Sequence, residues 1–187
     1  PEAIKYAIDR VAAVDGLDCR LHCSLVGAHT AAGRLHAVSL HDGAGRFDVE
    51  AGAFVDASGD ANLGFAAGVP AMRDLQPDRA RQVASFPVRF CGVPPDVYVD
   101  RAELAALMPD FRNDGEAGYV RPHGGHFIRL PGSNDLWWMG IDLVTDGLDS
   151  ADLGRAERTG RELAWRFLDL LRARLPGFAG AHIAATG

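Results

Sequence analysis

The segment AGAFVDASGDANLGFAAGVP, residues 51–70, constrains the fold more than any other part of this chain. Its apolar start predicts a short strand over Phe54–Asp56, which runs into the small-residue corner Ala57-Ser58-Gly59. Asp60 is a natural cap for a following helix that closes at Gly68. A strand, a glycine turn and a helix N-terminus together predict an anion or cofactor corner of an α/β protein. The alternative is that the turn residues only reverse the chain and cap the helix.

Charge and composition exclude several kinds of partner. The chain has 19 basic and 25 acidic residues, a formal net charge of −6, without charge runs. This balance argues against nucleic acid or an anionic membrane as the main partner. No apolar run reaches the ~18–20 residues of a membrane helix, and no secretory signal is present. We therefore expect a cytoplasmic protein with enough apolar residues (48%) for a substantial core.

The cysteines give no sign of a metal or a disulfide. Cys19, Cys23 and Cys91 form an odd set without a CxxC motif or a zinc-like spacing. On one strand, Cys19 and Cys23 would be ~13 Å apart, too far for a disulfide. We expect free buried thiols and no bound metal.

The first half of the chain predicts a helix followed by a small meander. Apolar spacing favours an amphipathic helix over residues 2–14 with one buried face. Alternation predicts a strand over 19–25 that continues to residue 30, then strands over 35–40 and 47–49. Glycine-rich turns separate the last three segments. Four histidines, at positions 22, 29, 36 and 41, are expected on the solvent side.

The second half predicts a sheet with flanking helices. Residues 71–81 are polar, charged and broken by proline, which indicates a linker. A strand over 86–91 follows, then a helix over 101–108 capped by Asp100. Strands over 127–130 and 136–143 form a hairpin, and Trp137 and Trp138 on it face opposite sides. A long helix over 151–175 is capped by Asp149 or Ser150.

A second group of functional residue types lies in RPHGGHFIRL, residues 121–130. His123 and His126 flank two glycines, and Arg121 and Arg129 bracket them. Such a loop can bind a carboxylate or donate a proton, because histidine titrates near neutrality and arginine makes bidentate anion contacts. No third ligand for a metal lies nearby. The alternative is a solvated glycine turn with polar tips.

The corner also carries a resemblance to a known family. VDASGDANLGFAAGVP resembles the VIDATGD-x-D-x-A-x-x-AG-x-P segment of FAD-dependent oxidoreductases of the glutathione-reductase and fumarate-reductase superfamily, and more narrowly a bacterial family of such flavoproteins. The similarity extends upstream through LHCSLVGAHTAAGRLHAVSLHDGAGRFDVE, and downstream through FPVRFCGV and the segment from DLWWMGIDLVTDG through ADLGRAERTGRELAWRFLDLLRARLPGF. Ser58 stands where threonine is usual and keeps the hydroxyl. Asn62 stands where an acidic residue is common.

The resemblance implies the fold, the cofactor and its binding residues. It implies an α/β (α+β) chain with part of an FAD-binding, Rossmann-like domain over residues 1–70 that contains the β-meander. A linker over 71–81 and a mixed-sheet, substrate-binding domain with a long helix over 82–187 follow. The cofactor is FAD, and the matching positions are Leu25, Val26, Ala57, Ser58, Gly59 and Asp60.

The family's GxGxxG phosphate loop does not occur in this sequence. We therefore expect an internal fragment of a longer flavoprotein that is inactive alone and holds FAD weakly. Its function would be hydride transfer to or from an unknown small-molecule substrate, with a homo-oligomer left open. The alternative function is a non-catalytic binding or assembly domain. A hydrolase that uses Ser58 is disfavoured, because D-A-S-G-D is not the G-x-S-x-G nucleophile motif.

Overall fold

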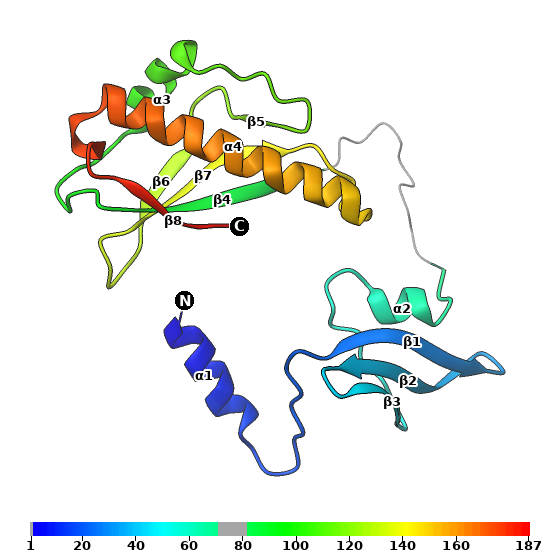
Figure 1. Cartoon of the computed structure of the whole chain (residues 1–187). Helices are drawn as coiled ribbons and strands as arrows, with labels where there is room; N and C mark the ends of the chain where they lie inside the picture. The colour runs from blue at the N-terminus through cyan, green and yellow to red at the C-terminus, as the bar shows by residue number, and fades with distance from the viewer. Residues whose placement is uncertain (1, 71–81) are drawn as a thin grey trace. The chain divides into compact units, whose positions relative to one another are not determined.

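The computed structural model describes residues 2–70 and 82–187 of the chain. The chain divides into two compact units, residues 1–78 (unit 1) and 79–187 (unit 2), which we treat separately (Figure 1). The linker predicted over residues 71–81 lies outside the described residues. None of the described helices is long and apolar enough to cross a membrane.

Unit 1 contains a three-stranded antiparallel meander with the order β1-β2-β3. Its elements are α1 (Glu2–Ala12), β1 (Ser24–Ala31), β2 (Arg34–Asp42), β3 (Gly45–Glu50) and α2 (Asn62–Ala66). The turn between β1 and β2 has left-handed backbone at both Ala32 (φ 50°) and Gly33 (φ 74°). This pair is typical of a hairpin turn whose twist matches the flanking strands. The predicted meander is therefore confirmed.

Three predictions for unit 1 are wrong in detail. Residues 19–23 are not a strand, because β1 begins at Ser24 opposite His41, next to the end of β2 at Asp42. Alternation alone does not make a strand where no neighbour extends to pair with it. Phe54–Asp56 is likewise irregular, and no described strand pairs with it.

The predicted apolar face of α1 is also not buried. Ile4, Ile8 and Val11 are 65%, 61% and 73% exposed, and no described residue of α1 is buried. The helical periodicity is correct, since α1 spans Glu2–Ala12. An amphipathic helix shows its apolar stripe to solvent when no partner surface covers it.

Unit 2 is a five-stranded sheet with one long helix. Its strands are β4 (Ala84–Cys91), β5 (Gly118–Val120), β6 (His126–Arg129), β7 (Leu136–Leu143) and β8 (His182–Thr186). Its helices are α3 (Arg101–Leu107), η1 (Met108–Asp110), α4 (Ser150–Arg174) and η2 (Pro176–Phe178). The strand order is β5-β7-β4-β8, and β6 also pairs with β7.

The predicted α/β (α+β) class is confirmed, but the sheet of unit 2 is not mixed. Every strand pair of this sheet is antiparallel. Strands β6 and β7 form a hairpin, and the other antiparallel pairs join strands that are not consecutive in the chain. No parallel pair occurs among the described residues of either unit, so the Rossmann-like character stays a prediction.

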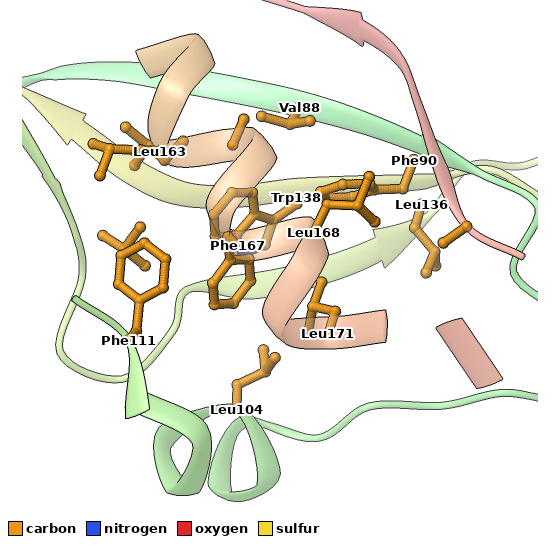
Figure 2. Close-up of a cluster of buried hydrophobic side chains, with 14 of the residues drawn as sticks. Val88, Phe90, Leu104, Phe111, Leu136, Trp138, Leu163, Phe167, Leu168 and Leu171 are labelled. Carbon is orange, nitrogen blue, oxygen red and sulfur yellow. The ribbon is translucent and has the colours of Figure 1, made fainter. Parts of the chain in front are cut away.

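Helix α4 covers one face of this sheet, and the core lies between them (Figures 1 and 2). Trp138 of β7 and Phe167 of α4 stack with their ring centroids 4.2 Å apart and their planes within 5°. Phe90 packs against Trp138, and Phe111 packs edge-on against Phe167. Trp138 and Phe167 are both fully buried, so this aromatic contact lies at the centre of the core.

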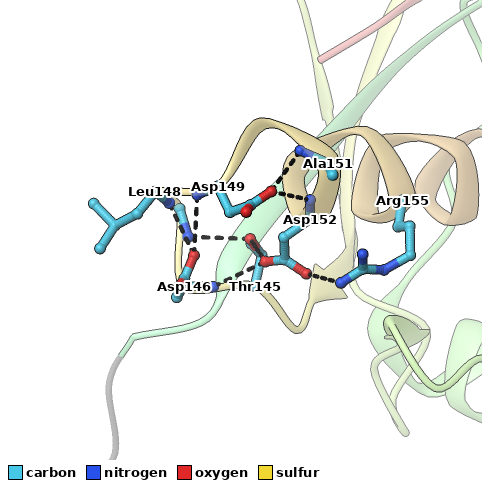
Figure 3. Close-up of polar contacts among 8 residues, drawn as sticks. Thr145, Asp146, Leu148, Asp149, Ala151, Asp152 and Arg155 are labelled. Atoms are coloured by element: carbon cyan, nitrogen blue, oxygen red, sulfur yellow. Dashed lines mark hydrogen bonds and ion pairs between the residues drawn. The ribbon is translucent and has the colours of Figure 1, made fainter.

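Both predicted helix caps in unit 2 are confirmed. The Asp100 side chain accepts the Glu103 N–H at the start of α3. The Asp149 side chain accepts the N–H groups of Ala151 and Asp152 at the start of α4 (Figure 3). Thr145 donates to Asp152 in the same network, which lowers the pKa of that carboxyl against the opposing effect of desolvation. The Asp100 and Asp149 carboxylates thus satisfy N–H groups of the first helical turn that otherwise lack partners.

Candidate functional site

The corner in unit 1 is organised by the carboxylate of Asp56. Oδ1 accepts the Ser58 backbone N–H (3.1 Å) and the Ser58 hydroxyl (2.7 Å). Oδ2 accepts the Gly64 N–H from inside α2 (2.9 Å). The Gly64 N–H, followed by the two Ser58 donors, lowers the pKa of Asp56. Asp56 therefore pins the turn to the helix that follows it.

The start of α2 differs from the sequence prediction, because Asp60 does not cap the helix. Ala61 occupies the cap position with a left-handed backbone (φ 56°) and makes no side-chain cap bond. The Ser58 hydroxyl instead accepts the Asn62 N–H at 2.9 Å. Gly59 has φ +83°, a conformation that glycine adopts without steric cost, as its predicted role in the turn requires.

The end of α2 was predicted correctly. Gly68 has φ +74° and its N–H donates to Phe65 O, while the Val69 N–H donates to Gly64 O. This pair of bonds is the Schellman motif, in which a left-handed glycine closes a helix.

An open groove of about 1120 Å³ lies between β1 and the corner. It is lined by Leu25 and Val26 from β1 and by Ala57 and Ser58 from the corner. Four of the six residues predicted to bind the cofactor thus meet in one groove of unit 1. The other two, Gly59 and Asp60, are exposed and do not line it.

A β-bulge places Val26 at this groove. Leu25 pairs with Leu40 and Gly27 pairs with Ser39, so Val26 has no partner residue across the ladder. A bulge leaves the extra residue outside the regular pairing and re-aims its side chain. Sequence reasoning identified Val26 only through the resemblance, because a bulge has no side-chain signature of its own.

The histidine loop of unit 2 is a four-residue insertion in an edge strand. β5 and β6 pair with the same edge of β7, and Arg121 N–H still donates to Gly140 O at 2.8 Å. His126 then pairs with Met139, the next residue of β7. Residues 122–125 (the histidine loop) therefore project from a strand that otherwise continues.

The two arginines of this segment have intramolecular partners. Arg121 makes a bidentate pair with the buried carboxylate of Asp142, with Nε 3.0 Å from both carboxylate oxygens and Nη2 2.6 Å from Oδ1. Arg129 donates to backbone carbonyls, including Asn134 O (2.7 Å) and Val97 O (2.9 Å). The structure thus shows each guanidinium holding the sheet and its loops together. Any role in binding a ligand stays a prediction.

The glycines of the histidine loop are buried rather than solvated. A Cβ atom on Gly125 would lie 2.4 Å from the Cα of Gly140, and one on Gly124 would lie 2.9 Å from the Cβ of Leu104. Trp138 Nε1 donates to Gly124 O at 2.8 Å. The solvated-turn alternative is therefore wrong for the glycines, because the loop backbone packs directly on β7 and α3.

The two histidines of this segment differ in their surroundings. His123 is half-buried, with Nδ1 3.1 Å from the Gly125 nitrogen and Nε2 3.0 Å from Arg101 Nη2. His126 is exposed at the start of β6. Sequence reasoning did not connect Arg101 with His123, since 22 positions separate them and only the docking of α3 brings them together.

Two further polar clusters were not predicted. The buried Ser39 hydroxyl donates to Asp48 (2.6 Å), accepts from Arg46 (2.8 Å) and lies 2.8 Å from His29 Nε2. The Ser39 hydrogen bond is the main cause that lowers the pKa of Asp48. Only the strand register, which sets Ser39 opposite Asp48, identifies this cluster.

The second cluster surrounds Asp135 in unit 2. The carboxylate accepts from the Cys91 thiol (3.0 Å) and forms an ion pair with Arg89. Burial and then Asp135 raise the pKa of Cys91, which keeps the thiol protonated. All three cysteines are free as predicted, but Cys19 is exposed and Cys23 and Cys91 are half-buried, so the prediction of buried thiols is wrong. No group of three potential metal ligands occurs in the described parts of the chain.

A comparison with family models agrees with the resemblance of the chain to FAD-dependent oxidoreductases. A family model described as FAD dependent oxidoreductase matches residues 1–187, the whole chain. No curated protein and no solved structure matches it. With a groove that gathers the predicted cofactor-binding residues and a family match over its full length, this chain belongs to the FAD dependent oxidoreductase family.

Proposed function

We propose that this chain takes part in hydride transfer between FAD and a small-molecule substrate, and that the groove of unit 1 holds the adenosine part of FAD. FAD-dependent oxidoreduction is the general activity of the family. The observation that carries the proposal is the meeting of Leu25, Val26, Ala57 and Ser58 in one groove. These residues come from two segments of the chain that the turn after Asp56 brings together.

The chemistry of the groove suits a flat and uncharged group. Three exposed apolar side chains line it, Val26 (52%), Val55 (87%) and Phe65 (75%). An adenine ring placed against them would cover apolar surface that otherwise faces water. The bulge at Val26 adds backbone polar groups at the same wall, which can read the edge of a purine.

The same lining fits a diphosphate poorly. No arginine or lysine is among the residues that line the groove. The one carboxylate, Asp56, is already engaged by Ser58 and Gly64. A diphosphate requires cations or free backbone N–H groups. We therefore assign adenine and ribose, and not the diphosphate, to this groove.

FAD, when bound, supplies the redox chemistry by accepting or releasing a hydride. The part of unit 1 is to bind and orient the cofactor and to exclude water from the purine. We assign substrate contact to unit 2, where residues 121–126 present His123 and His126 from a rigid backbone. We also propose that the substrate is a small molecule, that the protein is cytoplasmic and that it forms a homo-oligomer.

Ser58 supports a binding role and not a nucleophilic one. Its hydroxyl donates to Asp56 and accepts the Asn62 N–H. No histidine contacts it among the described residues, whereas a serine nucleophile needs an adjacent base. The hydrolase alternative therefore has no support in the geometry.

Calorimetric titration of the 187-residue chain with FAD, AMP and FMN tests the proposal. FAD and AMP are expected to bind saturably and to compete, because both contain adenosine. FMN is expected not to compete, because it lacks that part. Equal competition by FMN would contradict the assignment. Failure of FAD to bind to this chain and to any longer protein that contains it would favour the non-catalytic alternative.

A pair of valine variants locates the site. Val26→Glu places a carboxylate at the wall of the groove and is expected to weaken FAD and AMP binding about tenfold or more. Val49→Glu is the matched control, since Val49 is 38% exposed on the same sheet and does not line the groove. Equal effects of the two substitutions would place the adenosine elsewhere.

A further inference from the structure

Arg101 of α3 and His123 of the histidine loop meet as two hydrogen-bond donors. Arg101 Nη2 lies 3.0 Å from His123 Nε2. A guanidinium carries only donors, so this contact is a hydrogen bond only if Nε2 accepts. The other ring nitrogen, Nδ1, lies 3.1 Å from the Gly125 nitrogen, whose N–H points at it. Both ring nitrogens of His123 therefore face a donor.

No protonation state of His123 satisfies both contacts. A neutral imidazole has one acceptor nitrogen, and an imidazolium has none. If Nδ1 accepts the Gly125 N–H, the ring proton is on Nε2 and points at Arg101. The opposite tautomer points its proton at the Gly125 N–H instead. The group of Arg101, His123 and the Gly125 N–H thus lacks one acceptor in every protonation state of the ring.

The charge of Arg101 is also uncompensated among the described residues. Glu103, the acidic residue of α3, forms no ion pair with it, and the Asp100 carboxylate is used to cap the helix. Arg121, by contrast, is held by Asp142, and Arg129 by backbone carbonyls. Among the residues that the structure describes, no protein oxygen accepts a hydrogen bond from Arg101, unlike from Arg121 and Arg129.

The backbone segments that carry the two donors are held together by packing. Leu104, fully buried in α3, packs against Gly124, and Trp138 fixes the same glycine through its carbonyl. Arg101 lies three positions before Leu104 and so shares that face of the helix. Rigid placement of binding groups before the ligand arrives lowers the cost of binding.

We propose that Arg101 and His123 form a binding site for a small oxyanion, which accepts from Arg101 Nη2–H and His123 Nε2–H while Nδ1 accepts from Gly125. A carboxylate and a phosphate share this chemistry, and a carboxylate, with two coplanar oxygens, fits one donor from each residue. The identification of the oxyanion as part of the substrate rests on the proposed function. The site itself does not.

Nitrogen NMR of the His123 ring in the 187-residue chain tests this site. The probes are acetate and inorganic phosphate, each titrated at constant ionic strength against sodium chloride. We expect a saturable shift of the His123 ring signals and a single tautomer with the proton on Nε2 at saturation. Saturation by acetate alone identifies a carboxylate site, and tighter saturation by phosphate identifies a phosphoryl group.

Two variants with the same change in charge make the test specific. Arg101→Gln is expected to weaken the saturating anion about tenfold, because a charge-assisted hydrogen bond is lost. Arg158→Gln, at an exposed position of α4, is the matched control and should bind as the parent does. Saturation by neither anion, or equal weakening in both variants, would overturn the proposal. The titration contains no flavin, so a failure of FAD binding is a separate result.

Discussion

The two units of this chain bury their apolar residues to very different extents. In unit 2, sheet and helix α4 enclose an apolar core that includes Val88, Trp138 and Phe167, all fully buried. In unit 1, Ala37, Val38 and Ser39 are the buried residues among those described. Periodicity predicted apolar faces in both units. The difference shows that an apolar stripe becomes a core only where a second surface covers it.

The comparison predicts its largest effect at the centre of the unit 2 core. Phe167→Ala removes the ring that stacks on Trp138 and should reduce the free energy of unfolding by about 3–5 kcal/mol. Denaturant unfolding followed by tryptophan fluorescence measures it, because all three tryptophans lie in unit 2. Phe65→Ala, at a position 75% exposed in unit 1, is the control and should leave this transition unchanged. A loss below about 1 kcal/mol for Phe167→Ala would contradict the single core described here.

The next effect concerns the glycines of the histidine loop. Gly125→Ala should destabilise unit 2 by about 2 kcal/mol or more, because its Cβ would meet the backbone of Gly140 in addition to the strain of φ +79°. Gly132→Ala is the matched control, with φ +76° and nothing within 4 Å of the added Cβ. Its cost should be about 1 kcal/mol, from the left-handed backbone alone. The difference between the two midpoints measures the packing of the loop, and equal costs would show that the loop does not pack on β7.

A smaller effect is expected at the corner of unit 1. Ser58→Ala removes the acceptor of the Asn62 N–H and should cost about 1 kcal/mol locally, as the loss of a helix-capping hydroxyl does. Hydrogen exchange at the Asn62 amide is the measurement, with faster exchange expected in the variant. Ser58→Thr keeps the hydroxyl and should protect this amide as the parent does. Unchanged exchange in Ser58→Ala would show that α2 starts without help from Ser58.

The smallest effect concerns the pH dependence of the same corner. The folded state lowers the pKa of Asp56, so its contribution to stability is complete above the unfolded pKa of about 3.9. That contribution is lost as the pH falls through the lower folded pKa. Carboxyl-carbon NMR should show Asp56 titrating below pH ~3.9, and Ser58→Ala should raise its pKa toward that value. An Asp56 pKa that does not respond to Ser58→Ala would contradict the hydrogen bonds assigned to it.

The sequence predicts the elements of unit 2 well because its signals are local. Asp100 and Asp149 cap helices at the positions that their residue types indicate, and the hairpin of β6 and β7 follows from apolar alternation. The direction of strand pairing has no such local signal. For this reason a mixed sheet was expected where the structure has an antiparallel one. Burial of α1 depends on a partner surface, which no periodicity supplies.

The candidate sites likewise combine features that have a local sequence signal with features that depend on long-range contacts. The corner and its glycine turn are visible as small residues in a fixed order, and in the structure Asp56 holds them. The cap by Asp60 fails because the Ser58 hydroxyl takes the helix N–H instead. The approach of Arg101 to His123 and the Ser39 cluster depend on tertiary packing and register. Long-range geometry of this kind leaves no pattern along the chain.

The extra residue in β1 has a consequence for how this strand tolerates change in length. Side chains alternate between the two faces of a sheet, and one inserted residue would reverse the faces of everything before it unless a bulge absorbs that residue. Because Leu25 and Gly27 already pair with the consecutive residues Leu40 and Ser39, deleting Val26 would leave Leu25 on the face that it has now. Both substitution and deletion at this position are thus local events, whereas deletion of a regularly paired residue of β1 would turn one end of the strand over.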